Sequence, residues 1–307
     1  MAVDYNNDLL LITAASGKQA TALLPHLAPR FKRLRLQCIS DSSRKRLQEE
    51  YPNAEAIQSD FSDLTKAKTL LKGVATCYLI TPAFHPREAQ HGINMVDAAT
   101  QNYRCGEGPF KHLIFSSVIH SSIRAMANHD NKRYVEEALV DADIPYTILQ
   151  PTHIMDTTPI RMIAEQETPV FKARFDPRTE FSFVCTYDIG EAVAKIIMHR
   201  EQHLYATYQL VSTSEPLNYV EAMGIVSQVI GKTVRIERLS VDEAVEGFRG
   251  LIAAGTPEQD SQALLSNAAR MFVYYNRNGL KGNSNVLQML LGRKPLEYRE
   301  WVERQLK

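Results

Sequence analysis

The stretch Leu9–Leu24, LLLITAASGKQATALL, joins an apolar run, a turn of small residues and a second apolar pattern with helical spacing. This order is typical of the strand, phosphate-binding turn and helix that open a dinucleotide-binding fold. Alanines, Ala14 and Ala20, occupy two of the three positions where such a turn usually has glycine, and only Gly17 remains. The stretch therefore predicts either a variant phosphate site or a plain strand–turn–helix without a ligand.

The start of the predicted helix has the chemistry that a nucleotide needs. The first N–H groups of a helix have no partner within it and carry partial positive charge, which suits a pyrophosphate. If Ala14 adopts a positive φ, alanine is strained there by roughly 1 kcal/mol. The side chains and backbone around Gly17 that we expect to contact the cofactor are Thr13, Ala14, Ser16, Lys18 and Gln19.

The composition of the 307-residue chain is that of an ordinary globular protein, with 44% hydrophobic and 23% charged residues. Lysine plus arginine equals aspartate plus glutamate, at 35 each, so the chain lacks the basic excess of a nucleic-acid-binding protein. Its four scattered cysteines form no Cys-x-x-Cys pair, which predicts neither a zinc site nor a disulfide framework. The polar N-terminal residues and the lack of an apolar run of about 18 residues favour a cytoplasmic protein without a secretory signal or membrane span.

Short apolar runs alternate with helical patterns in the first half of the chain. We expect strands at 9–13, 34–39, 55–58, 76–81, 112–116 and 146–149, and helices at 17–27, 42–50, 64–71, 87–100 and 131–140. This alternation predicts an α/β fold with a Rossmann-type, doubly wound parallel sheet in the strand order 3-2-1-4-5-6. Residues 1–151 are predicted to form the NAD(P)-binding domain, with the ligand at the carboxyl ends of the strands.

The pattern is less regular after Pro151. We expect strands at 181–185, 208–211 and 233–238, and helices at 188–199, 217–231, 241–254 and around Trp301. Residues 152–307 are predicted to form mainly a smaller α/β substrate-binding lobe. Segments near 181–212 are expected to return to the Rossmann sheet.

Polar and aromatic residues follow the predicted strands on the side where the crevice should lie. Asp60 and Phe61 follow the third strand, where a carboxylate and an aromatic ring commonly meet an adenine. Thr81 and Pro82 follow the fourth strand, opposite the glycine turn, and Ser116 ends the fifth. Their order along the chain supports a nucleotide site more strongly than the turn alone.

Together these motifs resemble the NmrA-like family of atypical short-chain dehydrogenases. The segments that carry the resemblance are 13–19 (TAASGKQ), 60–63 (DFSD), 79–82 (LITP), 115–117 (FSS), 129–132 (HDNK) and 146–151 (YTILQP). The run 290–295 (LLGRKP) is similar to fungal members. The resemblance covers nearly the whole chain and implies binding of NAD(P)H between two lobes. Characterised relatives include reductases of quinones, isoflavones and dyes, and redox-sensing regulators.

The resemblance makes Lys132 the first candidate for chemistry, because the family lysine contacts the nicotinamide ribose and relays a proton. A lysine there could also stabilise a developing oxyanion. Its i,i+4 spacing to Glu136 is equally typical of a surface ion pair. Classical short-chain dehydrogenases carry a tyrosine four residues before this lysine. Asn128 occupies that position, so the Tyr-x-x-x-Lys acid/base is absent.

Further residues complete the predicted site. Ser117 could hydrogen-bond a substrate carbonyl or only cap the end of its strand. His129 could act as a general acid or be a solvated loop histidine. We expect substrate contacts from Phe84, His85, His120, His153, Ile154 and Met155, and cofactor contacts from Pro151 and Thr152. No metal-ligand spacing and no Gly-x-Ser-x-Gly motif is present, so neither a metal site nor a hydrolase is predicted.

The end of the second strand bears on the choice between NADPH and NADH. A basic residue there selects the 2′-phosphate and an acidic one the free ribose. The family position for arginine holds Ile39, but Ser40, Ser43 and Arg44 could still surround a phosphate. We therefore expect NADP(H), with NAD(H) as the alternative.

The sequence supports one main functional hypothesis and two alternatives. The first is an NADP(H)-dependent reductase that passes hydride directly to a small carbonyl, quinone or conjugated substrate. The missing tyrosine also fits a non-catalytic NADP(H)-sensing regulator that docks a protein partner. Ala14 also fits a non-redox isomerase, cyclase or dehydratase on the same scaffold. The substrate, pathway and oligomeric state are not fixed by the sequence.

Overall fold

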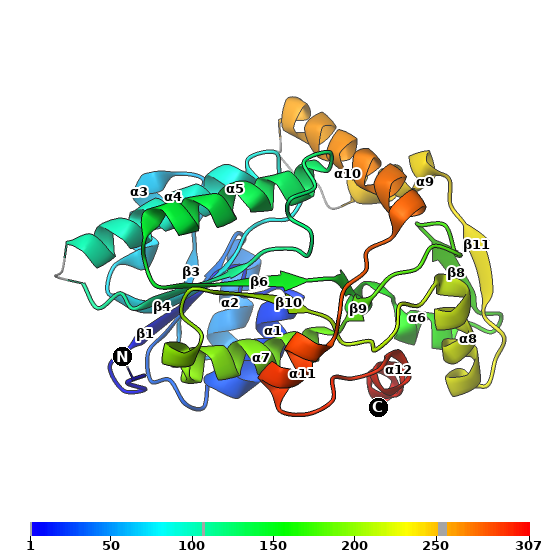
Figure 1. Ribbon diagram of the computed structural model, residues 1–307, viewed down its shortest axis with the longest axis horizontal. Helices are drawn as coiled ribbons and strands as arrows, with labels where there is room; N and C mark the ends of the chain where they lie inside the picture. The colour runs from blue at the N-terminus through cyan, green and yellow to red at the C-terminus, as the bar shows by residue number, and fades with distance from the viewer. Residues whose placement is uncertain (1, 106–107, 251–256) are drawn as a thin grey trace.

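A parallel sheet of seven strands forms the centre of the computed structural model, which describes residues 2–105, 108–250 and 257–307 (Figure 1). The strand order is β3-β2-β1-β4-β5-β6-β10, so the predicted order of the first six strands is confirmed. The bounds are β1 (Leu9–Ile12), β2 (Leu34–Cys38), β3 (Glu55–Gln58), β4 (Val74–Ile80), β5 (His112–Ser116), β6 (Tyr146–Pro151) and β10 (Ala206–Leu210). All neighbouring strands are parallel, which places their carboxyl ends at one edge.

Helices cover both faces of the sheet because its central strands are apolar on both sides. In β1, Leu10 and Ile12 point into one core, and Leu9 and Leu11 into the other. The helices on the first face are α1 (Lys18–Leu27), α2 (Asp41–Glu50), α7 (Thr186–Met198) and α11 (Asn285–Leu291). On the second face lie α3 (Leu64–Leu71), α4 (Glu88–Arg104) and α5 (Ala127–Ala142). The predicted helices are thus confirmed, with α5 beginning four residues earlier than expected.

A second group of elements lies beyond the carboxyl edge of the sheet (Figure 1). It contains two small parallel sheets, β7 (His153–Ile154) with β9 (Phe183–Val184) and β8 (Val170–Ala173) with β11 (Arg235–Arg238). The helices of this lobe are α6 (Ile160–Glu165), α8 (Tyr219–Ile230), α9 (Val241–Arg249), α10 (Glu258–Asn278) and α12 (Tyr298–Leu306). Their buried side chains form a core of their own, rich in aromatic rings. None of the helices in the described part is long and apolar enough to cross a membrane.

The structure corrects three expectations for this half. The strand predicted at 181–185 is shorter in the structure, where only β9 forms, and it pairs with β7 outside the large sheet. The backbone of Phe181 bridges Leu217 and Leu280 instead of extending this strand. Of the segments near 181–212, only β10 joins the large sheet as a strand. The helix α10 was not predicted. The helix predicted at 241–254 is observed as α9, and residues 251–254 lie outside the described residues.

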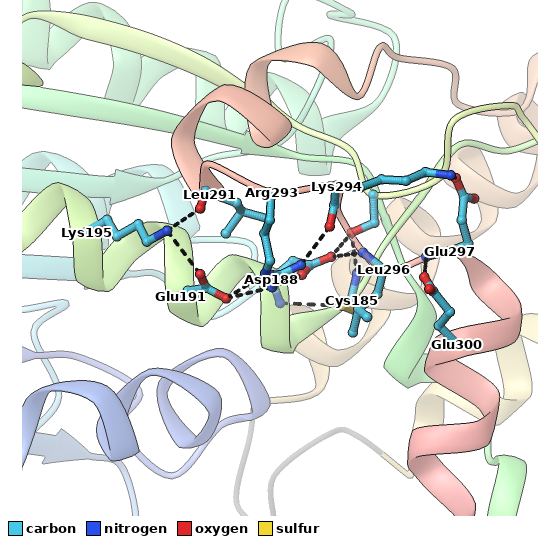
Figure 2. A network of polar contacts seen from close by, with 11 residues as sticks. Cys185, Asp188, Glu191, Lys195, Leu291, Arg293, Lys294, Leu296, Glu297 and Glu300 are labelled. Atoms are coloured by element: carbon cyan, nitrogen blue, oxygen red, sulfur yellow. Dashed lines mark hydrogen bonds and ion pairs between the residues drawn. The ribbon is translucent and has the colours of Figure 1, made fainter.

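A buried polar network ties the segment after α11 to helix α7 (Figure 2). Asp188 of α7 is fully buried and accepts hydrogen bonds from Arg293 Nη2 at 2.7 Å and from the Leu296 backbone N–H at 2.8 Å. Arg293 also pairs with Glu191 at 2.6 Å, and Lys195 Nζ donates to the Leu291 carbonyl. The run LLGRKP therefore holds the C-terminal segment against the sheet layer.

Candidate functional site

The turn after β1 adopts a left-handed backbone conformation at Ala14, although alanine stands there in place of glycine. Ala14 has φ 46°, in the left-handed region. The Gln37 side-chain oxygen accepts a hydrogen bond from the Ala14 N–H at 2.9 Å, and the Gln37 carbonyl accepts one from Ala15 at 2.8 Å. Gly17 donates to the Ala14 carbonyl at 2.9 Å, and a Cβ at position 17 would lie 3.1 Å from that oxygen. The tight phosphate-type turn thus forms with only one glycine.

The side chains around this turn are engaged with neighbouring strands and with the second lobe. Thr13 is buried and its hydroxyl donates to the Ile80 carbonyl at 2.9 Å. Lys18 Nζ donates to the carbonyl of Asp156, which links the turn to the C-terminal lobe. The Gln19 oxygen accepts hydrogen bonds from the Tyr78 hydroxyl at 2.8 Å and from Ser116 Oγ at 2.9 Å. Of the predicted contacts, Gly17 and Lys18 are exposed, and Ala14, Ser16 and Gln19 are half-buried.

At the end of β2, an apolar side chain stands among hydroxyl and basic groups. Ile39 is 69% exposed, which is unusual for isoleucine. Ser40 caps α2 by accepting from the Ser43 N–H at 3.2 Å. Arg44 is paired with Asp41 at 2.7 Å, so its charge is already compensated. Arg46 instead reaches toward the carbonyl of Ser16 in the glycine turn, at 3.4 Å.

The residues after β3 are only partly placed as expected. The Asp60 carboxylate accepts from the Ser62 backbone at 2.9 Å and lies 3.2 Å from His91 Nε2. Burial alone would raise the pKa of Asp60, but the Ser62 hydrogen bonds and His91 lower it on balance. Phe61 is 4% exposed and packs in the core between the sheet and α4. The ring therefore fills the core, and the contact of Phe61 with an adenine stays a prediction.

Lys132 lies in a buried polar cluster at the carboxyl ends of β4 and β5. Its Nζ donates to Thr81 Oγ1 at 2.6 Å and to the Ser116 carbonyl at 3.0 Å, and pairs with Glu88 Oε1 at 3.0 Å. Glu88 is fully buried and also accepts from the Thr81 hydroxyl at 2.9 Å. The predicted alternative, a surface pair with Glu136, is not what the lysine forms.

Glu136 binds Ser117 and its neighbours instead. It accepts hydrogen bonds from the hydroxyls of Ser117 and Ser121, the latter at 2.7 Å, and from Gln150 Nε2 at 3.0 Å. Since the Ser117 proton is given to a carboxylate, Ser117 presents lone pairs to the cavity. The predicted hydrogen bond from Ser117 to a substrate carbonyl is therefore disfavoured.

His129 is a buried residue at the contact between the Rossmann domain and the second lobe. Its Nδ1 lies 2.9 Å from the His120 carbonyl, which can only accept, so Nδ1 carries the proton. Its Nε2 then accepts from the Tyr275 hydroxyl of α10 at 2.8 Å. Burial lowers the pKa of His129 to about 4. A neutral, fully buried histidine with both nitrogens occupied is a poor general acid, which corrects that prediction.

A cavity of about 870 Å³ opens where the strand ends meet the second lobe. The predicted residues that line it are Gln19, Thr81, Phe84, Ser116, Ser117, Lys132, Pro151, Thr152, His153 and Ile154. His85, His120 and Met155 are not among the lining residues, and Met155 is fully buried in the core of the second lobe. His153 is held by the Tyr219 hydroxyl at 2.7 Å, and burial lowers the pKa of His153 to about 4.

Sequence reasoning missed the residues that the second lobe and α4 contribute. Glu88 lines the cavity beside Lys132, and Tyr275, Arg174 and Phe248 line it from the second lobe. A carboxylate at the first position of α4 was the one available signal for Glu88. Within the described residues, no group of three or more His, Cys, Asp or Glu side chains could hold a metal ion.

Known proteins that this chain is similar to include reductases and a regulator. A curated relative, the (4-alkanoyl-5-oxo-2,5-dihydrofuran-3-yl)methyl phosphate reductase of Streptomyces griseus subsp. griseus, is 25% identical over 255 residues, covering 80% of this chain and 81% of the relative. The NADPH-dependent quinone oxidoreductase of Escherichia coli, solved with NADPH, superposes with a TM-score of 0.74 at 19% identity over 97% of this chain and all of that one.

The negative transcriptional regulator NmrA, solved with NAD, superposes with a TM-score of 0.72 at 17% identity, over 97% of this chain and 95% of that one. At such identities these structures establish the shared fold. The sequence pattern of the NmrA-like family matches residues 6–288, nearly the whole chain. This protein therefore belongs to the NmrA-like family.

Proposed function

We propose that this protein is an NADP(H)-dependent oxidoreductase that reduces a small carbonyl, quinone or conjugated substrate by direct hydride transfer. The observation that carries the proposal is the cavity itself. It runs from the strand ends, with Lys132 in its wall, to the aromatic residues of the second lobe. Membership of the family and its likeness to reductases support the same reading.

The residues of the chain fit a dinucleotide. The turn from Ala14 to Gly17 would hold the pyrophosphate at the start of α1, and the exposed Ile39 would pack on the adenine. Thr81, Ser116 and Pro151 would surround the nicotinamide. When bound, the reduced nicotinamide supplies the hydride.

The protein's own contribution to the reaction is positioning and charge. The three N–H donors of Lys132 are already bound to Thr81, Ser116 and Glu88, so the lysine would act through its positive field on negative charge that develops on a substrate oxygen. The proton comes from water, because the Ser117 hydroxyl is bound to Glu136 and His129 is enclosed.

Arg46 is the basic residue that we expect to bind a 2′-phosphate, in place of Arg44. Arg44 and Lys45 both pair with Asp41, at 2.7 and 3.0 Å, whereas Arg46 faces the glycine turn. Fluorescence titration should show that Arg46→Ala weakens NADPH binding about tenfold and leaves NADH binding unchanged. Arg44→Ala is the matched control and should alter neither.

The test of the reaction is NADPH oxidation, followed by absorbance, with a panel of quinones, enones and aldehydes. Turnover with at least one member supports the proposal. If saturating NADPH binds and no member is reduced, the regulator hypothesis replaces it. That alternative is favoured by Asn128 at the position of the classical tyrosine and by the likeness to NmrA. Activity without any nucleotide would instead favour a non-redox enzyme.

A further inference from the structure

The part of the cavity that lies in the second lobe has an aromatic wall. The rings that line it include Phe84, Phe171, Phe175, Tyr219, Phe248 and Phe272. Several touch edge to face or tilted, with centroids 5.1 Å apart for Phe84 and Phe248, 5.4 Å for Phe248 and Phe272, and 5.3 Å for Phe175 and Phe272. Such a wall buries an extended apolar molecule and stacks on aromatic rings.

Five charged side chains line the cavity: two form an ion pair, and two others, Lys172 and Glu243, interact only through the longer-range effect of their charges. Lys132 pairs with Glu88. Glu243 accepts hydrogen bonds from the Ser240 N–H and hydroxyl, both at 2.8 Å, and the charge of Lys172 further lowers the pKa of that carboxyl. The fifth, Arg174, forms no ion pair with any residue that the structure describes.

Arg174 follows directly after β8 and is an exposed residue beside the aromatic wall. Its guanidinium carbon lies 5.8 Å from the centre of the Phe248 ring. Burial raises the pKa of Tyr219, and the positive charge of Arg174 opposes that rise. Asp176, the nearest acidic residue along the chain, is paired with Arg238 at 2.9 Å. The donors of Arg174 therefore remain available at the cavity.

We propose that the substrate of this site has an extended aromatic or otherwise apolar body and an anionic group that binds Arg174, with Lys172 beside it. The inference rests on the proposed reductase function and narrows its substrate class. A guanidinium presents two parallel donors to a carboxylate, sulfonate or phosphate. The anion fixes one end of the molecule, while the aromatic wall holds the body between Arg174 and the nicotinamide end of the cavity.

A pair of fluorescent probes tests the anion subsite without any reaction. Anilinonaphthalene sulfonate is anionic and N-phenylnaphthylamine is its neutral counterpart, and both are titrated into NADP⁺-saturated protein. Arg174→Ala should weaken binding of the sulfonate about tenfold, the loss of one charge-assisted hydrogen bond, and leave the neutral probe within about twofold. The exposed Arg178, which does not line the cavity, supplies the control variant Arg178→Ala and should change neither.

A second pair of variants tests whether the probes bind in the cavity. Gly247 lines the cavity and has open space around its Cβ position, so Gly247→Leu should weaken both probes. Gly224 has the same open surroundings on α8, away from the cavity, and Gly224→Leu should weaken neither. The inference is overturned if Arg174→Ala leaves sulfonate binding unchanged or weakens both probes equally.

Turnover gives an independent readout. For naphthoquinone sulfonate, Arg174→Ala should raise KM about tenfold at constant kcat, and for unsubstituted naphthoquinone both constants should stay unchanged. Equal rises in KM for both quinones, or weaker NADPH binding, would assign Arg174 to the fold or the cofactor and overturn the inference. If the parent protein reduces neither quinone, the proposed function fails for this class, and the probe titration alone decides the anion subsite.

Discussion

Ala14 keeps a backbone conformation that alanine adopts only under constraint. At φ 46°, this backbone conformation costs alanine roughly 1 kcal/mol more than it would cost glycine. The hydrogen bond from its N–H to Gln37 already holds the turn in place. We therefore expect the turn to bind phosphate without further rearrangement.

Replacing the strained alanine tests this view. Ala14→Gly should raise the free energy of unfolding by up to about 1 kcal/mol and change NADPH affinity by less than about twofold. The neighbouring Ala15 is buried and outside the left-handed region, so Ala15→Gly should lower stability by about 1 kcal/mol. Urea unfolding and nucleotide titration measure the two effects. Equal losses from both substitutions would show that Ala14 is not strained.

Lys132 and Glu88 depend on each other, which affects any test of the lysine. Lys132→Met leaves the fully buried Glu88 without its cation and should lower the free energy of unfolding by roughly 3 kcal/mol. The double variant Lys132→Met with Glu88→Gln should recover much of that loss, because the uncompensated charge is gone. Denaturant unfolding of the three proteins checks this coupling. A single variant as stable as the parent would contradict it.

The same double variant gives the cleaner test of catalysis. It should bind NADPH and stay folded, yet reduce substrate at least about a hundredfold more slowly than the parent. Loss of activity in the single variant alone has two explanations, one chemical and one structural. The comparison of single and double variants separates them.

Helix α7 is held on two sides. It packs directly on α1, and a Cβ added at Gly190 would lie 2.6 Å from the Ala22 carbonyl oxygen. Its other side is tied to the C-terminal segment through Asp188 and Arg293 (Figure 2). This helix therefore couples the sheet layer to the end of the chain.

Glycine-to-alanine changes in two helices should have opposite effects. Gly190→Ala forces α7 away from α1 and should lower the free energy of unfolding by about 2 kcal/mol. Gly224 of α8 is exposed and has no atom within 4 Å of its Cβ position. Gly224→Ala should therefore raise the free energy of unfolding by about 0.5 kcal/mol. Thermal or urea unfolding measures both. If Gly190→Ala were also stabilising, the close helix contact would be refuted.

At the scale of the whole molecule, buried neutral histidines set a response to acid. Burial lowers the pKa of His112 to about 3, and those of His129 and His153 to about 4, from an ordinary value of 6.5. Above pH 6.5, these histidines are mostly neutral in both the folded and the unfolded protein. As the pH falls below it, the unfolded chain takes up protons that the folded protein cannot, so stability falls until the folded pKa values are reached.

One histidine variant isolates this effect. Each buried histidine contributes about 1.4 kcal/mol per pH unit to the slope of unfolding free energy between about pH 6 and pH 5. His112→Gln should reduce the slope of unfolding free energy against pH by about 1.4 kcal/mol per pH unit. His199 is exposed, and His199→Gln should leave the slope unchanged. Urea unfolding across this range is the measurement, and an unaltered slope in His112→Gln would mean that His112 is protonated in the fold.

The sequence by itself determined the strand order of the first six strands, their flanking helices and the family. These follow from local signals, since apolar periodicity and a turn of small residues depend on neighbours along the chain. The same signals placed Thr81 near the crevice, and the family resemblance added Lys132. Helix α10 was missed although its buried residues Ala268, Met271, Phe272 and Tyr275 recur at helical spacing.

Only the tertiary structure decided what each site residue does. Phe61 is in the core, His129 bonds Tyr275 from a helix 146 residues away, and Glu88 in place of Glu136 pairs with Lys132. Arg174 reaches the cavity because the second lobe folds back over the strand ends. Such pairings depend on which distant segments meet, and no local preference of the chain specifies that.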